Sequence, residues 1–299
     1  MPVPHLLGVS LAVIAAASFA VQYLCVRIGT VRGSVRTVVF VSLLTNVVLI
    51  VPLALLWYGV PTVTPAAVLW FAAAGFAGSL LARLCLFKSV ETIGASRTSP
   101  IAATNVFFAT ILAVLLFGEP VTLLHGVGIV LLVGGVAVIS WETAVNETEN
   151  GSLSEVGVYL SIPLIAAVFL GIEPIFVSLG LDTGTPILTG VAIKAVAATS
   201  GFVGFLVVSG AISRELYRWT PDMKWHLAAG VTSTIGIVCL FAALAVAPVV
   251  IVAPLIQTSP LIVVVLSAVF LPRQLERVTW RLFAAAAVVV LGVGIVSVH

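Results

Sequence analysis

Long apolar stretches alternate with short polar turns along the whole chain of 299 residues. A membrane-spanning helix needs about 20 predominantly apolar residues, and we find ten stretches of that kind. The predicted spans are residues 6–28, 35–58, 66–91, 97–117, 122–141, 155–181, 185–209, 225–246, 249–271 and 277–297. The pattern therefore predicts an all-α membrane protein with ten transmembrane helices.

The second half of the chain repeats short motifs of the first half in the same order. Trp70–Gly75 returns as Trp225–Gly230 after 155 positions, and Cys85-Leu86-Phe87 returns as Cys239-Leu240-Phe241 after 154 positions. The segment that begins at Gly135 returns 157 positions later. Matches in one order at nearly one spacing indicate two copies of one unit.

We therefore divide the chain into a first five-helix repeat at 1–141, an acidic linker at 142–154 and a second five-helix repeat at 155–299. A unit with an odd number of spans ends on the opposite side of the membrane from its start. The second copy is therefore inserted upside down relative to the first. This inverted repeat is the architecture of many alternating-access transporters.

Composition agrees with a membrane protein and excludes several other classes. Hydrophobic residues make up 61% of the chain and charged residues 8%, against roughly 25% charged residues in soluble domains. The net charge of +2 gives no reason to expect a nucleic-acid partner. Cys25, Cys85 and Cys239 lie in apolar segments without metal-ligand spacing, so we expect them to be packing residues. We expect no metal and no cofactor.

Basic residues gather in or beside the loops of one side. They are Arg27, Arg32, Arg36, Lys88, Arg97, Arg214, Arg218, Lys224, Arg273, Arg277 and Arg281. The positive-inside rule places these loops in the cytoplasm of a plasma-membrane protein, with both termini outside. The apolar N-terminal stretch has no basic leader and more spans follow it, so we expect it to be the first helix.

The end of each copy carries the clearest family resemblance. Phe117-Gly118-Glu119-Pro120-Val121-Thr122 joins one apolar helix to a helix with Gly126, Gly134 and Gly135. This element resembles the drug/metabolite transporter superfamily, in particular its EamA-like branch of ten-helix proteins with two five-helix copies. The second copy departs from the pattern, because Arg273-Gln274-Leu275 precedes its Glu276 without a glycine. The resemblance implies a transporter and leaves the substrate open, since members carry amino acids, sugars, nucleotide sugars or drugs.

Glu119 and Glu276 each lie at the start of the helix that follows, together with Thr122 and Thr279. A carboxylate there accepts hydrogen bonds from free N–H groups and meets the positive end of the helix dipole. We therefore expect both glutamates to be helix caps.

Glu173 and Lys194 are charged residues deep within predicted spans, where charges are costly and often functional. They lie about eight and nine residues from the turn at Asp182–Gly184, which corresponds to ~12–14 Å along each helix. The two side chains are therefore predicted to pair across this hairpin. Three interpretations stay open: a purely structural pair, Lys194 binding the carboxylate or phosphate of a substrate, or Glu173 acting as a carboxylate for which protons and substrate compete. In the related small multidrug resistance proteins the coupling glutamate lies in the first helix, and Glu173 lies in the first helix of the second copy.

Uncharged polar residues supply further candidates for a substrate site. They are Gln22, Tyr23, Asn46, Thr104, Asn105, Gln257, Thr258 and Ser259. Several follow Pro100 or Pro254, and a proline within a span frees backbone carbonyls that can face a cavity. The alternative is interhelical hydrogen bonding, worth roughly 0.6 kcal/mol for each bond.

Three more charged residues lie in the third span. Lys88 and Glu91 are spaced for an ion pair at the membrane boundary, and Arg83 is the deepest of the three and a minor candidate for the site.

These observations predict a secondary transporter that moves a small organic metabolite by alternating access. The alternative is a proton-coupled exporter of drug-like or cationic compounds, with protons as the coupling ion. A membrane scaffold or receptor is a lesser alternative. We do not expect an enzyme, because the spans carry no nucleophile with its base, no paired aspartates and no HExxH or GxSxG motif. The expected partners are a small-molecule substrate and the lipid bilayer; the oligomeric state is left open.

Overall fold

The computed structural model describes residues 3–59, 62–117, 123–147, 153–211, 219–246, 252, 255–272 and 274–297. Within these ranges the chain forms helices and turns, without strands. The elements are α1 (Val3–Gly29), α2 (Val35–Tyr58), α3 (Pro65–Ala74), the π-helical segment η1 (Gly75–Ala82), α4 (Arg83–Ile93), α5 (Ala95–Ala102), α6 (Asn105–Phe117), α7 (Leu123–Glu147), α8 (Leu153–Leu181), α9 (Ile187–Val208), α10 (Met223–Val246), α12 (Ser259–Phe270) and α13 (Trp280–Ser297).

The ten-span, two-repeat architecture predicted from the sequence is confirmed. In the described part of the chain, six apolar segments are long enough to cross a membrane, and three further apolar helices are shorter. The remaining span is the broken helix α5–α6. Large apolar side chains such as Leu56 and Val208 are about nine-tenths exposed on the outer surface, where lipid would cover them.

Some boundaries differ from the predicted ones. The span predicted at 97–117 is interrupted at Ala103 and Thr104, just after Pro100, whose ring removes a helical hydrogen bond. α7 and α8 reach into the predicted linker from both sides, and residues 148–152 lie outside the described ranges. The same holds for Glu119, Thr122, Arg214, Arg218, Pro254 and Arg273.

The third span contains a π-helical turn, η1, between α3 and α4. The repeat explains its origin. The spacing between copies is 155 at Gly75 and Gly230 but 154 at Cys85 and Cys239, so the first copy has one extra residue between these points. The matching stretch of α10 is continuous α-helix. A π-helical turn accommodates one additional residue within an α-helix, and such turns are frequent at functional sites.

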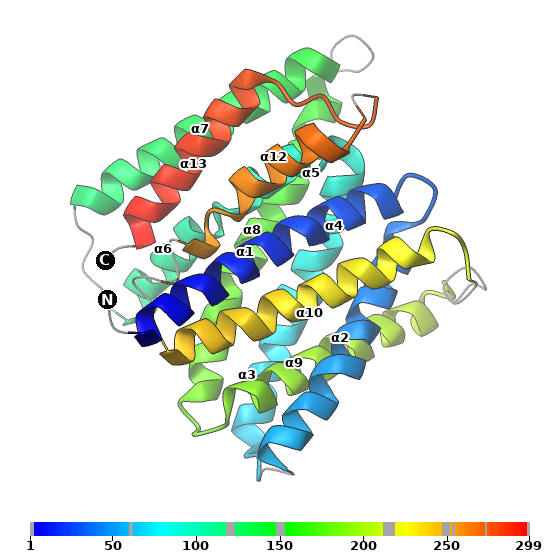
Figure 1. Ribbon diagram of the computed structural model, residues 1–299, viewed down its shortest axis with the longest axis vertical. Coiled ribbons are helices and arrows are strands. Elements are labelled where there is room, and N and C mark those ends of the chain that lie inside the picture. Colours follow the sequence, from blue (N-terminus) through cyan, green and yellow to red (C-terminus); the bar gives the residue numbers. More distant parts are fainter. Residues whose placement is uncertain are drawn as a thin grey trace.

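Contacts between the copies follow the inverted symmetry. α1, the first span, packs along α10, the third span of the second copy, while α8 packs along α3, η1 and α4 (Figure 1). Gly75 lies against the backbone carbonyl of Lys194 in α9, and its counterpart Gly230 lies against Thr45 in α2. Each third span therefore approaches the second span of the other copy at the same glycine.

The last helices of the two copies form a separate pair. α7 and α13 lie side by side at one edge of the molecule (Figure 1). Gly135 lies against Val289, and Gly292 lies against the backbone of Gly128, so small residues allow the close approach. The other spans surround the centre of the molecule, where the polar residues converge.

Candidate functional site

A cavity of about 360 Å³ lies between the two copies, lined by residues of α1, η1, α4, α5, α6, α8, α9, α10 and α12. Seven of the ten predicted site residues line it: Gln22, Tyr23, Asn105, Glu173, Lys194, Gln257 and Ser259. They come from both halves of the sequence. The fold therefore collects most of the dispersed polar candidates at one place.

The other three predicted residues are not among those that line the cavity. Thr104 donates to the carbonyl of Ile101 at 2.7 Å, and Thr258 donates to the carbonyl of Leu255 at 2.6 Å. Both hydroxyls thus satisfy backbone groups at corresponding helix breaks of the two copies. Asn46 lies behind the cavity wall, 3.0 Å from the hydroxyl of Thr234.

Glu173 of α8 and Lys194 of α9 form an ion pair, as the hairpin geometry predicted. Their side chains are 18% and 12% exposed, and both line the cavity. Gly78 of η1 lies directly against the Glu173 carboxylate, in space that a Cβ atom would fill. Thus η1 provides room for both members of the pair, through Gly78 for the carboxylate and Gly75 for the backbone of Lys194.

Arg83, a minor candidate in the sequence, lies at the wall of the cavity and is 9% exposed. Its guanidinium donates to the hydroxyls of Ser42 at 3.4 Å and Ser233 at 3.2 Å. The Asn46 amide, with its oxygen turned toward Arg83, accepts from both terminal nitrogens at 3.2 Å. The guanidinium also lies 5.9 Å from the centre of the Phe87 ring. Neutral groups therefore hold a buried cation at this position.

Two serines of the first copy also line the cavity and were not singled out from the sequence. Ser79 belongs to η1. Ser99 of α5 is buried, and its hydroxyl has no hydrogen-bond partner in the part of the chain that the structure describes. Serines in apolar spans usually bond to their own helix backbone, so sequence alone gave little signal. For Arg83 and Ser79, the sequence offered one indication: the spacing between the copies changes from 155 to 154 residues in the stretch that contains them.

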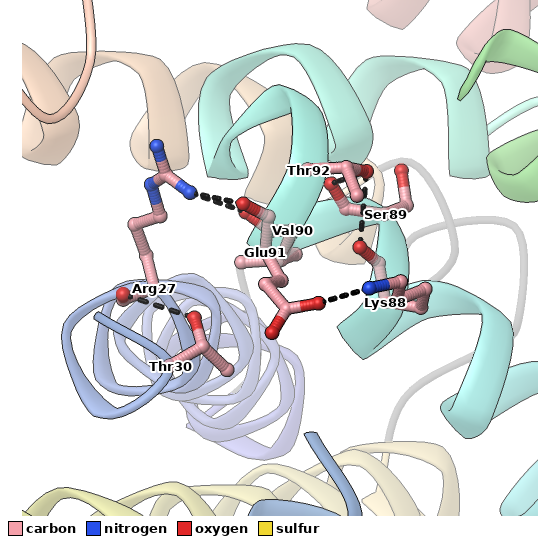
Figure 2. Close-up of polar contacts among 7 residues, drawn as sticks. All are labelled: Arg27, Thr30, Lys88, Ser89, Val90, Glu91 and Thr92. Atoms are coloured by element: carbon pink, nitrogen blue, oxygen red, sulfur yellow. Dashed lines mark hydrogen bonds and ion pairs between the residues drawn. The ribbon is translucent and has the colours of Figure 1, made fainter. Parts of the chain in front are cut away.

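The basic end of the molecule is bridged by contacts between the copies. Arg27 of α1 donates to the carbonyls of Val90 at 3.1 Å and Glu91 at 2.5 Å, which end α4 (Figure 2). The same guanidinium donates to the carbonyl of Leu275, in the second copy, at 2.5 Å. Arg97 donates to the carbonyl of Arg277 at 3.2 Å. These bonds join the first copy to the turn that precedes α13.

Glu276 is a helix cap, although not of the helix that follows it. Its carboxylate accepts from the backbone N–H groups of Ala95 at 3.2 Å and Ser96 at 2.5 Å, at the start of α5 in the other copy. Gly94 allows this contact, because its φ of +92° is open to glycine and a side chain there would meet Glu276. The start of α13 is capped instead by Thr279, which accepts from Leu282 N–H at 3.2 Å.

Lys88 and Glu91 form the predicted ion pair, at 2.5 Å, with exposed fractions of 53% and 28% (Figure 2). They lie beside the Arg27 contacts and outside the cavity lining. In the described residues, no three His, Cys, Asp or Glu side chains gather in a way that would hold a metal ion.

A solved structure, described as "Crystal structure of protein", shares this fold. It is 13% identical in sequence, with a TM-score of 0.64 over 98% of this chain and 95% of the other. No curated protein sequence matches the chain significantly. The model of the EamA-like transporter family matches residues 6–141 and again residues 157–298. Its members are membrane transporters of small solutes and not enzymes. The chain therefore belongs to the EamA-like transporter family and is a multi-pass integral membrane protein.

Proposed function

We propose that this protein is a secondary transporter that moves a small organic metabolite by alternating access through the central cavity. The observation that carries the proposal is the position of the cavity between two inverted copies whose basic ends are joined by cross-copy hydrogen bonds. Inverted repeats give a transporter two related conformations around one midplane site. Breaking the cross-copy contacts at the basic end and forming equivalent contacts at the opposite end would expose the cavity to each side of the membrane in turn.

Gln257 offers a direct test, because it lines the cavity while Gln274 is an exposed residue outside its lining. The purified protein is first screened by thermal shift against amino acids, sugars, nucleotides and organic cations. Uptake of each stabilising compound is then measured in proteoliposomes and in protein-free liposomes. We expect Gln257→Ala to lower uptake while the protein stays folded, and Gln274→Ala to leave it unchanged. If no compound enters faster than in protein-free liposomes, a scaffold or receptor replaces the transporter.

A second candidate is a proton-coupled exporter of drug-like or cationic compounds. It is favoured by one observation: Glu173 is the acidic residue among the described residues that line the cavity. Its carboxylate is already paired with Lys194, which favours the first proposal. The two are separated by imposing a pH gradient on proteoliposomes loaded with a quaternary ammonium compound. Efflux that follows the gradient and disappears in Glu173→Gln would support the exporter.

We further propose that the protein resides in the plasma membrane with its basic loops in the cytoplasm and both termini outside. The support is the positive-inside rule applied to the loops that contain Arg32 or are flanked by Arg27, Lys88 and Arg97.

A further inference from the structure

The described residues that line the cavity have an excess of one positive charge. Glu173 and Lys194 neutralise each other as an ion pair, whereas the hydrogen-bond partners described for Arg83 are neutral groups. Among the described residues no carboxylate lies within ion-pair distance of Arg83, and Glu173 acts on it only through the electrostatic field. A buried cation without an anionic partner is costly in an apolar setting. An anionic ligand would remove that cost.

Arg83 directly follows η1, which accommodates the extra residue of the first copy. A π-helical turn absorbs one inserted residue, so the side chains after it keep the directions of their counterparts in the other copy. In the 154-residue register that follows η1, the counterpart of Arg83 is Ile237 of α10, which also lines the cavity. The first copy therefore places a cation where the second copy places an apolar side chain. One side of the cavity carries a positive charge, and the side related to it by the repeat does not.

The rest of the wall suits an apolar body. Phe19, Tyr23, Phe87 and Phe241 contribute aromatic rings, and the volume of about 360 Å³ is near the lower end for small-molecule sites. Ser99 adds a buried hydroxyl that has no hydrogen-bond partner among the described residues. An anionic head on Arg83 with an apolar group against the rings would satisfy both parts of the wall.

We propose that the cavity binds a small organic monoanion with an apolar body, and that Arg83 holds its carboxylate. The inference rests on the proposed transport function and specifies its substrate class. Arg83 supplies a planar fork of N–H donors, and a ligand carboxylate would accept from it in place of the hydroxyls of Ser42 and Ser233. The Glu173–Lys194 pair stays intact beside it and adds no net charge, so one negative charge balances the cavity and a second would be in excess.

Binding is tested with phenylacetate and phenylacetamide, which have the same shape and differ in charge. Benzyltrimethylammonium serves as the cation of similar size. Affinities are measured by calorimetry on the purified wild type, on Arg83→Met and on Arg83→Lys. Arg32→Met is the matched control, because Arg32 lies in an exposed turn outside the cavity lining.

We expect phenylacetate to bind the wild type and Arg32→Met equally. Loss of charge-assisted hydrogen bonds in Arg83→Met should weaken binding by about 10- to 100-fold. Arg83→Lys keeps the charge without the fork, so its loss of affinity for phenylacetate should be smaller. If Arg83→Met does not fold, Arg83→Lys still tests the role of the guanidinium. Phenylacetamide and the ammonium compound should bind the wild type at least tenfold more weakly than phenylacetate, roughly the value of one charged hydrogen bond. Equal binding of the three compounds, or binding of phenylacetate that is indifferent to Arg83, overturns the proposal.

Transport of the same compounds distinguishes this inference from the function on which it rests. Initial uptake rates are measured in proteoliposomes, with the leak into protein-free liposomes subtracted. Uptake of phenylacetate that falls in both Arg83 variants supports both proposals. Uptake of the amide or the ammonium compound in preference to phenylacetate overturns the anion assignment and leaves the transporter standing. Arg83-dependent binding without uptake of any compound supports the anion site and overturns the transport function.

Discussion

Neither Glu173 nor Lys194 is stable alone in the membrane interior, because an unpaired buried charge is costly. Their side chains are mostly buried, so each depends on the other. We expect Glu173→Gln or Lys194→Met to lower the free energy of unfolding by about 3 kcal/mol, as for other buried pairs that lose one partner. The double variant Glu173→Gln/Lys194→Met should lose less than the sum. The measurement is a double-mutant cycle of thermal unfolding in detergent.

The cycle also decides between a structural pair and a working one. A double variant that regains stability and keeps full uptake would show that the pair only stabilises the hairpin. A double variant that is stable but inactive would assign the pair to transport. Purely additive losses would contradict the ion-pair energetics themselves.

Gly78 gives a second prediction at this scale. A Cβ atom there would overlap the Glu173 carboxylate, so Gly78→Ala must displace that side chain from Lys194. Overpacking of this kind costs typically about 1–3 kcal/mol, and uptake should fall with it. Gly204→Ala in α9 is the matched control, because nothing lies within 4 Å of the added methyl group. Calorimetric unfolding of the two variants checks the difference; equal stabilities would contradict the close contact.

The sequence predicted this pair because its geometry is local. Two helices joined by the turn at Asp182–Gly184 bring equidistant residues together. It did not predict the cavity position of Arg83, because counting residues gives the depth of a side chain along a span but not the neighbouring helices that it faces. Nor did it separate Gln257, which lines the cavity, from Thr258, whose hydroxyl bonds to the backbone.

At the scale of elements, η1 is the point where the two copies differ in backbone structure. Deleting Leu81 would give the third span of the first copy the register of α10, in which the counterpart of Arg83, Ile237, faces the cavity. We expect the protein to fold, since the second copy forms this span without the extra residue. Phenylacetate binding should be retained, because Arg83 keeps its direction. Leu81→Ala keeps the π-helical turn and should also bind normally; thermal unfolding and calorimetry of both variants provide the measurement. A deletion variant that folds but no longer binds phenylacetate would show that η1 itself sets the direction of Arg83.

The basic end provides a prediction about gating. Glu276 caps α5 of the other copy and also attracts Arg27. Glu276→Gln replaces charge-assisted bonds with neutral ones, a loss of about 1.4 kcal/mol that corresponds to roughly a tenfold shift toward the open state. We expect a tenfold faster reaction of Ala103→Cys, a cavity-lining position, with a maleimide added at the basic side. Cys25, Cys85 and Cys239 are first replaced by alanine.

Lys88→Met is the control for this experiment, because it breaks an exposed pair worth about 0–1 kcal/mol beside the same contacts. A labelling rate that rises equally in both variants would indicate general loosening of this end. An unchanged rate in Glu276→Gln would show that the cross-copy cap does not hold the gate closed.

For the whole molecule, the sequence was sufficient to predict the number of spans and the inverted repeat. Lipid forces each apolar stretch into a helix, and the repeat relates contacts such as Gly75–Lys194 and Gly230–Thr45. Positions of helix breaks were harder to predict, because Pro100 and Pro52 have the same local chemistry, yet only the former is followed by a break in the described chain. Whether a proline leads to a break depends on how neighbouring helices pack around it, which the local sequence does not show.

The proposed orientation of the molecule in the membrane rests on loop charge alone and gives the last prediction. The loops between α1 and α2 and between α4 and α5 lie on the same side as the turn before α13, and all contain or adjoin arginine. Translocation of basic loops is disfavoured, so both termini should be outside. Alkaline phosphatase fused after residue 299 should be active, and green fluorescent protein fused there should be dark. Replacing Arg32 and Arg36 with glutamine should weaken this preference, because they flank the first loop. The opposite pattern of reporter activity would place the termini in the cytoplasm and show that helix packing, not loop charge, sets the orientation.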